Sequence, residues 1–194
     1  MRVLLLYCHP LESSFNAAVR DAAVSALRVA GHEVDLCDLH AEGFDPVLGA
    51  EERLHYLDET RNQARVRSHV QRLLDAQALV LVFPVWNLGL PALLKGWFDR
   101  VFLPGISFRL NADGRTEPGL THLRHVAAFC TYGLPRWKVW WLGDAPRAFV
   151  CRFLRRVTAG RARVRFHALY DLNTADDTAR RDFLRATAEA ARSL

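Results

Sequence analysis

Residues 83–102 read Phe-Pro-Val-Trp-Asn-Leu-Gly-Leu-Pro-Ala-Leu-Leu-Lys-Gly-Trp-Phe-Asp-Arg-Val-Phe. The run that leads into them, residues 78–83, is apolar, which is typical of a parallel strand buried on both faces. Pro84 is expected to end this strand. Pro91 fits the first turn of a following helix, where its missing N–H costs no hydrogen bond. The loop between the two prolines therefore lies at the carboxyl end of a central strand, where open α/β sheets bind ligands.

Hydrophobic periodicity predicts further elements on both sides of this stretch. The predicted strands are residues 2–8, 33–38, 78–83, 125–131 and 164–170. The predicted helices are residues 15–30, 61–75 and 91–102, one within 143–158, and a last one that Thr174 or Asp176 caps. The turn Asn-Ala-Asp-Gly at residues 111–114 indicates a small hairpin within residues 107–120. Five strands that alternate with helices predict an α/β fold, a flavodoxin-like three-layer sandwich with a five-stranded parallel sheet and helices on both faces. We expect one domain over residues 1–194.

Composition limits the function classes. The net charge is +5, and residues 134–166 carry nine Lys and Arg against the single acid Asp144. Such a patch attracts anions, although a solvated helix face is an equally good interpretation. The aromatic-and-basic pattern of RNA-binding modules is absent, so nucleic acid is not an expected partner. The four cysteines form no CxxC pair. The apolar run at the N-terminus is too short for a signal peptide core, and no apolar run approaches the length of a membrane span, so we expect a cytoplasmic protein with reduced thiols.

Polar side chains follow the first predicted strand, where residues 9–17 read His-Pro-Leu-Glu-Ser-Ser-Phe-Asn-Ala. Free N–H groups at the start of the next helix form an anion site, to which Ser13, Ser14 and Asn16 add donors. His9 either donates a further hydrogen bond or carries charge beside a phosphate. The alternative is that Ser13 or Ser14 only caps the helix. The pattern matches neither a dinucleotide fingerprint nor a Walker loop.

Two more loops follow strands of the predicted sheet. Residues 84–90 are apolar and carry Trp86, and residues 131–137 read Thr-Tyr-Gly-Leu-Pro-Arg-Trp. All three loops should converge on one edge of the sheet. Phosphate donors in one loop, with backbone amides and flat rings in the others, suit a planar heteroaromatic ring on a phosphate tail, which describes a flavin.

On these motifs the chain resembles the flavodoxin-like NAD(P)H:quinone oxidoreductases, the family of DT-diaphorase and the modulator-of-drug-activity quinone reductases. The matching residues are His9-Pro10, Ser14-Phe15-Asn16-Ala17, Phe83-Pro84 and the run from Pro91 to Phe102. The resemblance covers about residues 2–135 well and the remainder loosely.

The resemblance implies a homodimer that binds FAD or FMN. It implies a ping-pong reaction in which NAD(P)H reduces the flavin and a quinone or similar electrophile reoxidises it. It also implies the residues that contact the flavin. The phosphate tail would be held by His9, Ser14, Phe15, Asn16 and Ala17, the ring edge lined by Pro84, Val85, Trp86, Asn87 and Leu88, and the N1–O2 side approached by Thr131, Tyr132 and Gly133.

The chain departs from the family pattern in two places. Asn87 and Leu88 stand where two large aromatic residues are usual, so the roof over the ring and the acceptor should differ. The usual Tyr and His that assist hydride transfer fall near Lys138 and Asp144, and their roles do not carry over. A proton donor, where one is needed, would be Tyr132, Lys138 or water.

Other residues have competing interpretations. His122 and His125 are three apart without an acidic or thiolate ligand nearby, so no metal site is expected. Trp137, Trp140 and Trp141 beside the basic run indicate a dimer interface, a pocket wall or a peripheral membrane contact. An alternative function is a flavin-binding ancillary subunit of a membrane partner such as a potassium-efflux system. A flavodoxin-type electron carrier is disfavoured because such carriers are typically acidic.

Overall fold

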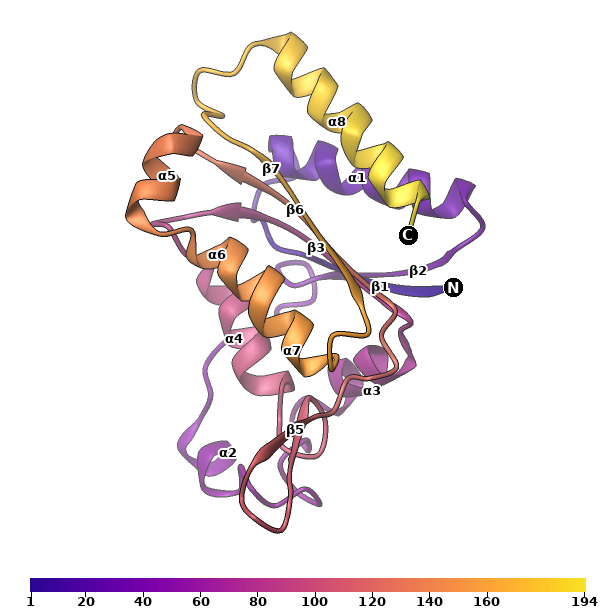
Figure 1. The fold of residues 1–194 in the computed structure, drawn as a ribbon, viewed down its shortest axis with the longest axis vertical. Coiled ribbons are helices and arrows are strands. Elements are labelled where there is room, and N and C mark those ends of the chain that lie inside the picture. Colours follow the sequence, from indigo (N-terminus) through magenta and orange to yellow (C-terminus); the bar gives the residue numbers. More distant parts are fainter.

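The computed structural model describes residues 1–194 and has one central parallel sheet (Figure 1). Its strands are β1 (Arg2–Tyr7), β2 (Glu33–Asp38), β3 (Ala78–Val85), β6 (His125–Tyr132) and β7 (Arg163–Leu169). Their spatial order is β2-β1-β3-β6-β7, and every neighbouring pair is parallel. This is the flavodoxin-like order, and it confirms the predicted fold class. Its switch point lies between β1 and β3, where the direction of strand addition reverses.

Helices cover both faces of the sheet. On one face lie α1 (Phe15–Val29) and α8 (Asp177–Arg192), which run side by side above the sheet in Figure 1. The opposite face is covered by α3 (Arg67–Asp75), α4 (Ala92–Val101) and a bent helix made of α6 (Ala145–Ala148), the π-helical turn η1 (Phe149–Leu154) and α7 (Arg155–Val157). The remaining elements are α2 (Ala50–Leu54), α5 (Arg136–Leu142) and the hairpin β4 (Phe108–Leu110) and β5 (Thr116–Pro118). The hairpin was expected. None of the helices combines the length and the apolar character that a membrane crossing requires.

The central strand explains the two apolar layers. Along β3, alternate side chains enter cores on opposite faces. Leu79, Leu81 and Phe83 join the core beneath α4, whereas Val80 and Val82 join the core beneath α1. All eight residues of β3 are buried, so the strand reads as a continuous apolar run.

The prediction that Pro84 ends this strand is wrong, because β3 continues to Val85. The carbonyl of Val82 accepts from the N–H of Cys8, so Val82 faces β1 with its backbone polar groups. Two residues later Pro84 faces the same way, but the pairing with β1 stops at Tyr7–Val82. The N–H that Pro84 lacks would therefore have had no partner on β1, so the proline costs no ladder hydrogen bond. On its other side β3 stays paired with β6 as far as Val85.

Other boundaries also differ from the sequence prediction. Pro91 is the N-cap of α4 rather than a residue of its first turn. Residues 61–66 form turns, so the helix expected from residue 61 begins at Arg67. The helix α5 was not predicted, and the expected helix within residues 143–158 contains the π-helical turn η1. Asp176, one of the two proposed caps, accepts from the N–H of Ala179 and caps α8.

Candidate functional site

The three predicted loops meet at the carboxyl edge of the sheet. The rings of His9 and Trp86 have centroids 5.8 Å apart, which brings the loops after β1 and β3 together. The Asn16 amide Nδ2 donates to Thr131 Oγ1 over 3.0 Å, which joins the start of α1 to the end of β6. Asn16 is buried, and its Oδ1 has no hydrogen-bond partner. The convergence expected from the sequence therefore holds, and one end of a buried amide is left free there.

The loop before α1 presents unused backbone donors. The N–H groups of Glu12, Ser13, Phe15 and Asn16 have no acceptor within the protein. Ser14 is the N-cap of α1, and its Oγ accepts from the N–H of Ala17 over 3.1 Å. Ser14 thus caps the helix, as the alternative interpretation held. Its neighbours nevertheless leave several N–H groups available at the positive end of a 15-residue helix, which is an arrangement that binds phosphate.

We call the free N–H groups at the start of α1 the phosphate cradle. The electrostatics around this cradle favour the binding of an anion. Glu12, the acidic residue of the loop, is held by two 2.9 Å hydrogen bonds from Arg20, and these bonds lower its pKa. Burial is the main cause that lowers the pKa of His9, so the ring is neutral at neutral pH. Its Nδ1 accepts from the N–H of Leu11 over 3.1 Å, which places the ring proton on Nε2. Of the two roles expected for His9, the structure favours a neutral hydrogen-bond donor.

The loop after β3 has an unusual backbone. Asn87 and Leu88 both have positive φ angles, 49° and 60°, and the N–H of Gly89 donates to the carbonyl of Trp86 over 2.9 Å. These features define a tight turn of the I′ type, in which asparagine is favoured but leucine is strained. The N–H groups of Asn87 and Leu88 have no acceptor within the protein. The strain therefore holds two backbone donors at the edge where a ligand is expected.

A depression of about 450 Å³ lies between this turn and the loop after β6. Such a volume is within the usual range of small-molecule sites. The lining includes six residues predicted from the sequence and two that were missed, Leu134 and Asn173. It is formed by Val85, Trp86, Asn87, Leu88, Tyr132, Gly133, Leu134 and Asn173. Asn173 belongs to a fourth loop, which follows β7 at the same edge. The polar run after the last predicted strand was the signal that could have found it.

Three of the predicted residues, two from the phosphate side and one from the N1–O2 side, differ in what they offer. The ring of Phe15 lies 6.3 Å from that of Phe183 on α8, so its side chain packs against the core and its free N–H is the group it offers to a ligand. Ala17 is buried, and Ser14 already accepts from its N–H. Thr131 holds Asn16, as described above. The structure therefore brings the predicted residues together, but several of their side chains contact other parts of the protein and leave few groups free for a ligand.

Tyr132 is almost fully buried, and its hydroxyl is bonded to Asp144, a residue that does not line this depression. It donates to Asp144 Oδ1 over 2.6 Å, its ring stacks on Tyr170 at 4.7 Å, and the Tyr170 hydroxyl donates to Asp144 Oδ2 over 3.4 Å. Burial is the main cause that raises the pKa of Tyr132, and the Asp144 carboxylate adds to it. The tyrosine stays protonated and bonded to Asp144, so we propose that it positions the loop rather than donating a proton.

Replacing Tyr132 with phenylalanine should cost about 1–3 kcal/mol of unfolding free energy, because it removes one donor from a partly buried carboxylate. Turnover of the flavin-loaded protein should change less than about threefold, whereas loss of a general acid typically costs roughly 100-fold or more. Chemical denaturation and steady-state kinetics give the two readouts. Tyr170→Phe, at the longer bond, is the matched control and should destabilise less. A 100-fold fall in turnover for Tyr132→Phe would restore the catalytic assignment.

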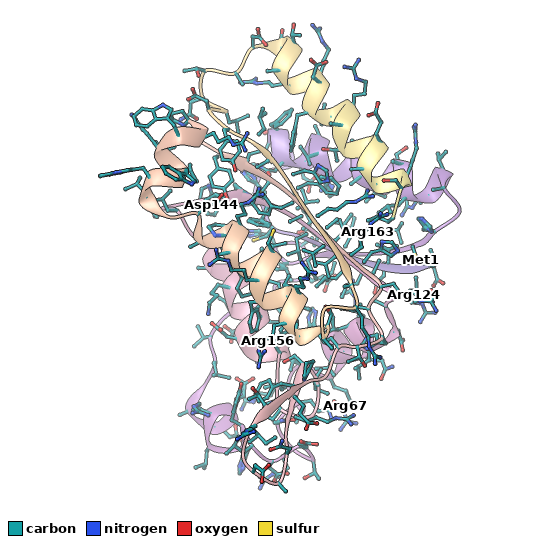
Figure 2. All side chains as sticks on the ribbon, viewed as in Figure 1. Met1, Arg67, Arg124, Asp144, Arg156 and Arg163 are labelled. Carbon is teal, nitrogen blue, oxygen red and sulfur yellow. The ribbon has the colours of Figure 1, made fainter.

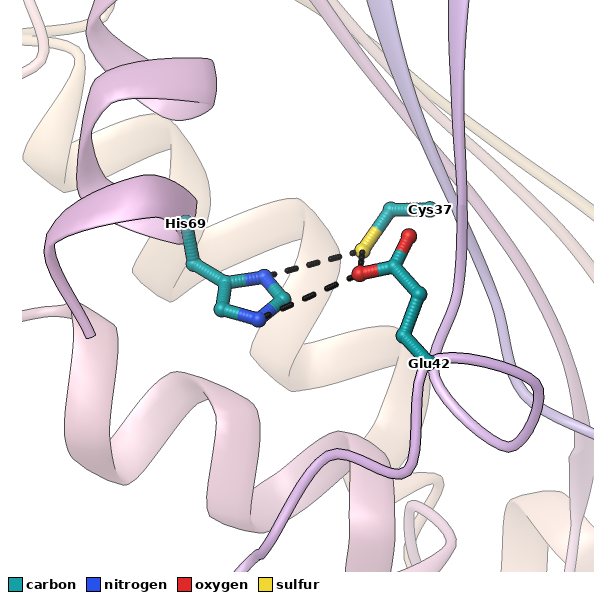
Figure 3. Close-up of side chains that lie close together, drawn as sticks. All are labelled: Cys37, Glu42 and His69. Carbon is teal, nitrogen blue, oxygen red and sulfur yellow. Dashed lines mark hydrogen bonds and ion pairs between the residues drawn. The ribbon is translucent and has the colours of Figure 1, made fainter. Parts of the chain in front are cut away.

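A separate cluster of potential metal ligands lies beside the edge strand β2, where Cys37, Glu42 and His69 approach one another (Figure 3). The thiol of Cys37 donates to Glu42 over 3.6 Å, and Arg72 donates to both Glu42 oxygens over 2.9 Å. The indole N–H of Trp97 donates to His69 Nδ1 over 3.3 Å. Burial raises the pKa of the Cys37 thiol and lowers that of His69. Because each group has a partner, we interpret the cluster as a network that joins β2, α3 and α4.

This network makes stability depend on pH. A histidine whose pKa is lowered by folding binds fewer protons in the folded than in the unfolded state, so its contribution is complete above about pH 6.5 and is lost as the pH falls toward the folded pKa. The urea midpoint should therefore fall between about pH 7.5 and 5.5. His69→Gln, which keeps an acceptor for Trp97, should flatten that dependence. His55→Gln, whose side chain makes no hydrogen bond, should leave it unchanged, and equal slopes in all three proteins would contradict this account.

The chain resembles known proteins over its whole length. The family model Flavodoxin_2, described as a flavodoxin-like fold, matches residues 1–193. NAD(P)H dehydrogenase (quinone) 1 of Cavia porcellus is 35% identical over 124 residues, which cover 55% of this chain and 45% of that protein. The chain thus spans about half the length of curated relatives such as this one.

Solved structures match more completely. The NAD(P)H:quinone oxidoreductase from Methanothermobacter marburgensis superposes with a TM-score of 0.84 at 26% identity and covers 99% of this chain and 98% of that one. An FMN-dependent NADH-azoreductase from Bacillus anthracis, solved with FMN, reaches a TM-score of 0.77 at 15% identity, covering 99% and 98% of the two chains. At that identity the likeness concerns the fold alone.

Proposed function

We propose a function from the premise that this chain belongs to the flavodoxin-like fold family Flavodoxin_2. The proposed function is that of a flavin-dependent NAD(P)H oxidoreductase, with FMN or FAD as cofactor and a quinone or similar electrophile as acceptor. The observation that carries it is the convergence of a phosphate cradle and a flat-walled depression on one sheet edge. Relatives named as NAD(P)H quinone oxidoreductases support the reaction class.

The residues at this edge fit a flavin. The free N–H groups of Glu12, Ser13 and Phe15 would bind the phosphate, and the buried Asn16 beside them keeps an Oδ1 without a hydrogen-bond partner. When bound there, a flavin would supply hydride-transfer chemistry between NAD(P)H and a quinone, which would take up the hydride and a further proton and leave as hydroquinone. The protein holds the ring and stabilises the negative charge that reduction places on it.

Backbone donors around the depression supply that stabilisation. The N–H groups of Asn87, Leu88, Gly133 and Leu134 have no acceptor within the protein. Fixed backbone dipoles of this kind stabilise developing charge without reorganising during the reaction. Trp86 and Leu88 would exclude water from the ring edge. Asn87 is exposed and is smaller than the aromatic residue usual at its position, so the space above the ring is left open. An open space there supports a planar acceptor as the substrate class.

We also propose that the working unit is a homodimer. The helix α5 exposes Trp137 and Trp141 by 66% and 76%, and these residues are four apart and so share one side of the helix. Large exposed aromatic surfaces of this kind mark interaction sites. A second copy of the chain seated there would close the neighbouring depression, where Leu134 lies. A membrane partner is the alternative occupant, and it would suit the ancillary-subunit function.

Steady-state kinetics test the reaction. Purified protein supplied with flavin should oxidise NAD(P)H only when a quinone is present, and varied concentrations of both substrates should give the parallel reciprocal plots of a ping-pong scheme. Protein that binds flavin but oxidises no NAD(P)H with any quinone tested would contradict the reductase. That result would favour the ancillary subunit instead.

A further inference from the structure

A second depression, of about 530 Å³, lies between the end of α5 and the bent helix α6–η1–α7. We call it the arginine pocket and define it by the lining residues Trp140, Asp144, Arg147, Cys151 and Arg152. Asp144 and Arg156 mark the two ends of this bent helix in Figure 2. None of these side chains contributes directly to the proposed flavin site.

The arginine pocket carries uncompensated positive charge. Arg147 and Arg152 are exposed and take part in no ion pair, although seven other Lys and Arg residues of the chain do. The guanidinium of Arg147 lies 5.4 Å from the centre of the Phe166 ring, which supports it from below. Neighbouring cations that also lack ion pairs are Arg136, Lys138, Arg155 and Arg156. A concave site with this charge attracts phosphate, which arginine binds through paired N–H groups.

The single acid of the arginine pocket does not cancel this charge. Asp144 accepts from the Tyr132 and Tyr170 hydroxyls and from the N–H of Arg147 over 3.2 Å. Its carboxylate is therefore turned toward the two tyrosines and the start of α6. It forms an ion pair with neither Arg147 nor Arg152.

An aromatic face stands beside these arginines. Trp140 is 81% exposed, which is unusual for a tryptophan. A flat, accessible ring next to guanidinium groups is the combination that binds a nucleotide, since the base stacks on the ring and the phosphate meets the arginines.

The arginine pocket is also close to the proposed flavin site. Tyr132 lines the flavin-side depression, and its hydroxyl bonds to Asp144 of the arginine pocket over 2.6 Å. Leu134 lines the first depression just before α5 begins, and Trp140 lines the second near the end of the same short helix. A nicotinamide dinucleotide is an extended molecule with its reactive ring at one end and adenosine at the other.

We propose that the arginine pocket binds the adenosine 2′-phosphate end of NADPH and thereby selects NADPH over NADH. Arg147 and Arg152 would bind the 2′-phosphate, and Trp140 would stack on the adenine. The inference rests on the proposed function, because it supplies the reason for a dinucleotide to reach this surface.

Equilibrium binding of adenosine 2′,5′-bisphosphate tests the proposal without any turnover, with adenosine 5′-monophosphate and inorganic phosphate as comparison ligands. Calorimetry should show that the bisphosphate binds most tightly. The double variant Arg147→Gln/Arg152→Gln should weaken bisphosphate binding at least about tenfold and hardly change monophosphate binding. Trp140→Ala should weaken the binding of both nucleotides by the same factor, since stacking on the adenine does not depend on the 2′-phosphate.

The matched control is Arg155→Gln/Arg156→Gln, which removes the same charge one turn farther along the helix. It should retain bisphosphate binding within about threefold. Equal weakening by both double variants would overturn the proposal, and so would inorganic phosphate binding as tightly as the bisphosphate. Either result would show that the positive surface attracts anions without a specific site.

Kinetics then separate this proposal from the proposed function. In the flavin-loaded protein, Arg147→Gln/Arg152→Gln should lower kcat/KM for NADPH at least about tenfold and leave that for NADH within about threefold. Wild-type protein that uses both nucleotides equally overturns the selectivity while the reductase stands. Protein without flavin or reductase activity refutes the proposed function, and the bisphosphate titration still decides whether the arginine pocket binds a nucleotide.

Discussion

Replacing Ser14 with aspartate is expected to weaken flavin binding roughly tenfold to a thousandfold while the protein stays folded. Aspartate caps helices about as well as serine, and its charge suits the positive end of α1. The same charge would lie beside the phosphate that the free N–H groups of Ser13 and Phe15 are proposed to bind. Like charges about 4 Å apart near a protein surface repel by about 1–4 kcal/mol. Titration of the stripped protein with FMN and FAD measures the loss.

The matched control is Ser14→Asn, which has nearly the shape of aspartate and also caps helices well. It should bind flavin within a few-fold of the wild type, because only the charge differs. Both variants should keep the wild-type unfolding midpoint within a few degrees. If the asparagine and aspartate variants bound flavin equally well, the phosphate would not lie at the start of α1.

Replacing Gly96 with alanine is expected to destabilise the protein by about 1–3 kcal/mol, although alanine is the better helix former. Gly96 lies in α4 against the loop that contains Pro46, and a Cβ there would be 2.3 Å from the Pro46 carbonyl oxygen and 2.5 Å from its Cα. Helix propensity alone predicts a gain of about 0.5–1 kcal/mol. The two mechanisms therefore predict opposite signs for the change in unfolding free energy. We expect overpacking to be the larger effect, because the backbone of Pro46 cannot shift as easily as a flexible side chain.

Chemical denaturation measures this change. Gly49→Ala is the control, since a Cβ there would meet only Glu52 Oε2 at an ordinary 3.5 Å, and it should cost less than about 1 kcal/mol. Stabilisation by Gly96→Ala would show that the Pro46 loop moves away freely. The close approach also explains the glycine within the long motif of residues 91–102.

Much of the fold was predictable from the sequence because buried parallel strands are continuous apolar runs. Residues 78–83 identified the central strand for this reason. Pro84 was placed outside β3 because the cost of its missing N–H depends on which neighbouring strand it faces, and that is a property of the assembled sheet. The helix α5 escaped prediction because its tryptophans face outward, so it lacks a single buried stripe.

The candidate site was predictable to the level of its loops. Loops after parallel strands must share an edge, so His9, Trp86 and Thr131 were expected to converge. Side-chain directions were not predictable. The hydroxyl of Tyr132 bonds to Asp144, twelve residues farther along the chain, and Phe15 packs on α8 rather than facing the cradle. Both outcomes depend on tertiary contacts that neither periodicity nor spacing encodes.

The most direct test of the central claim is the visible absorption spectrum of the purified protein before and after addition of FMN and FAD. The purified protein is expected to be yellow, or colourless but able to take up close to one flavin per chain, and chromatography of the released cofactor would identify the flavin. Protein that is colourless and binds neither FMN nor FAD would contradict the account.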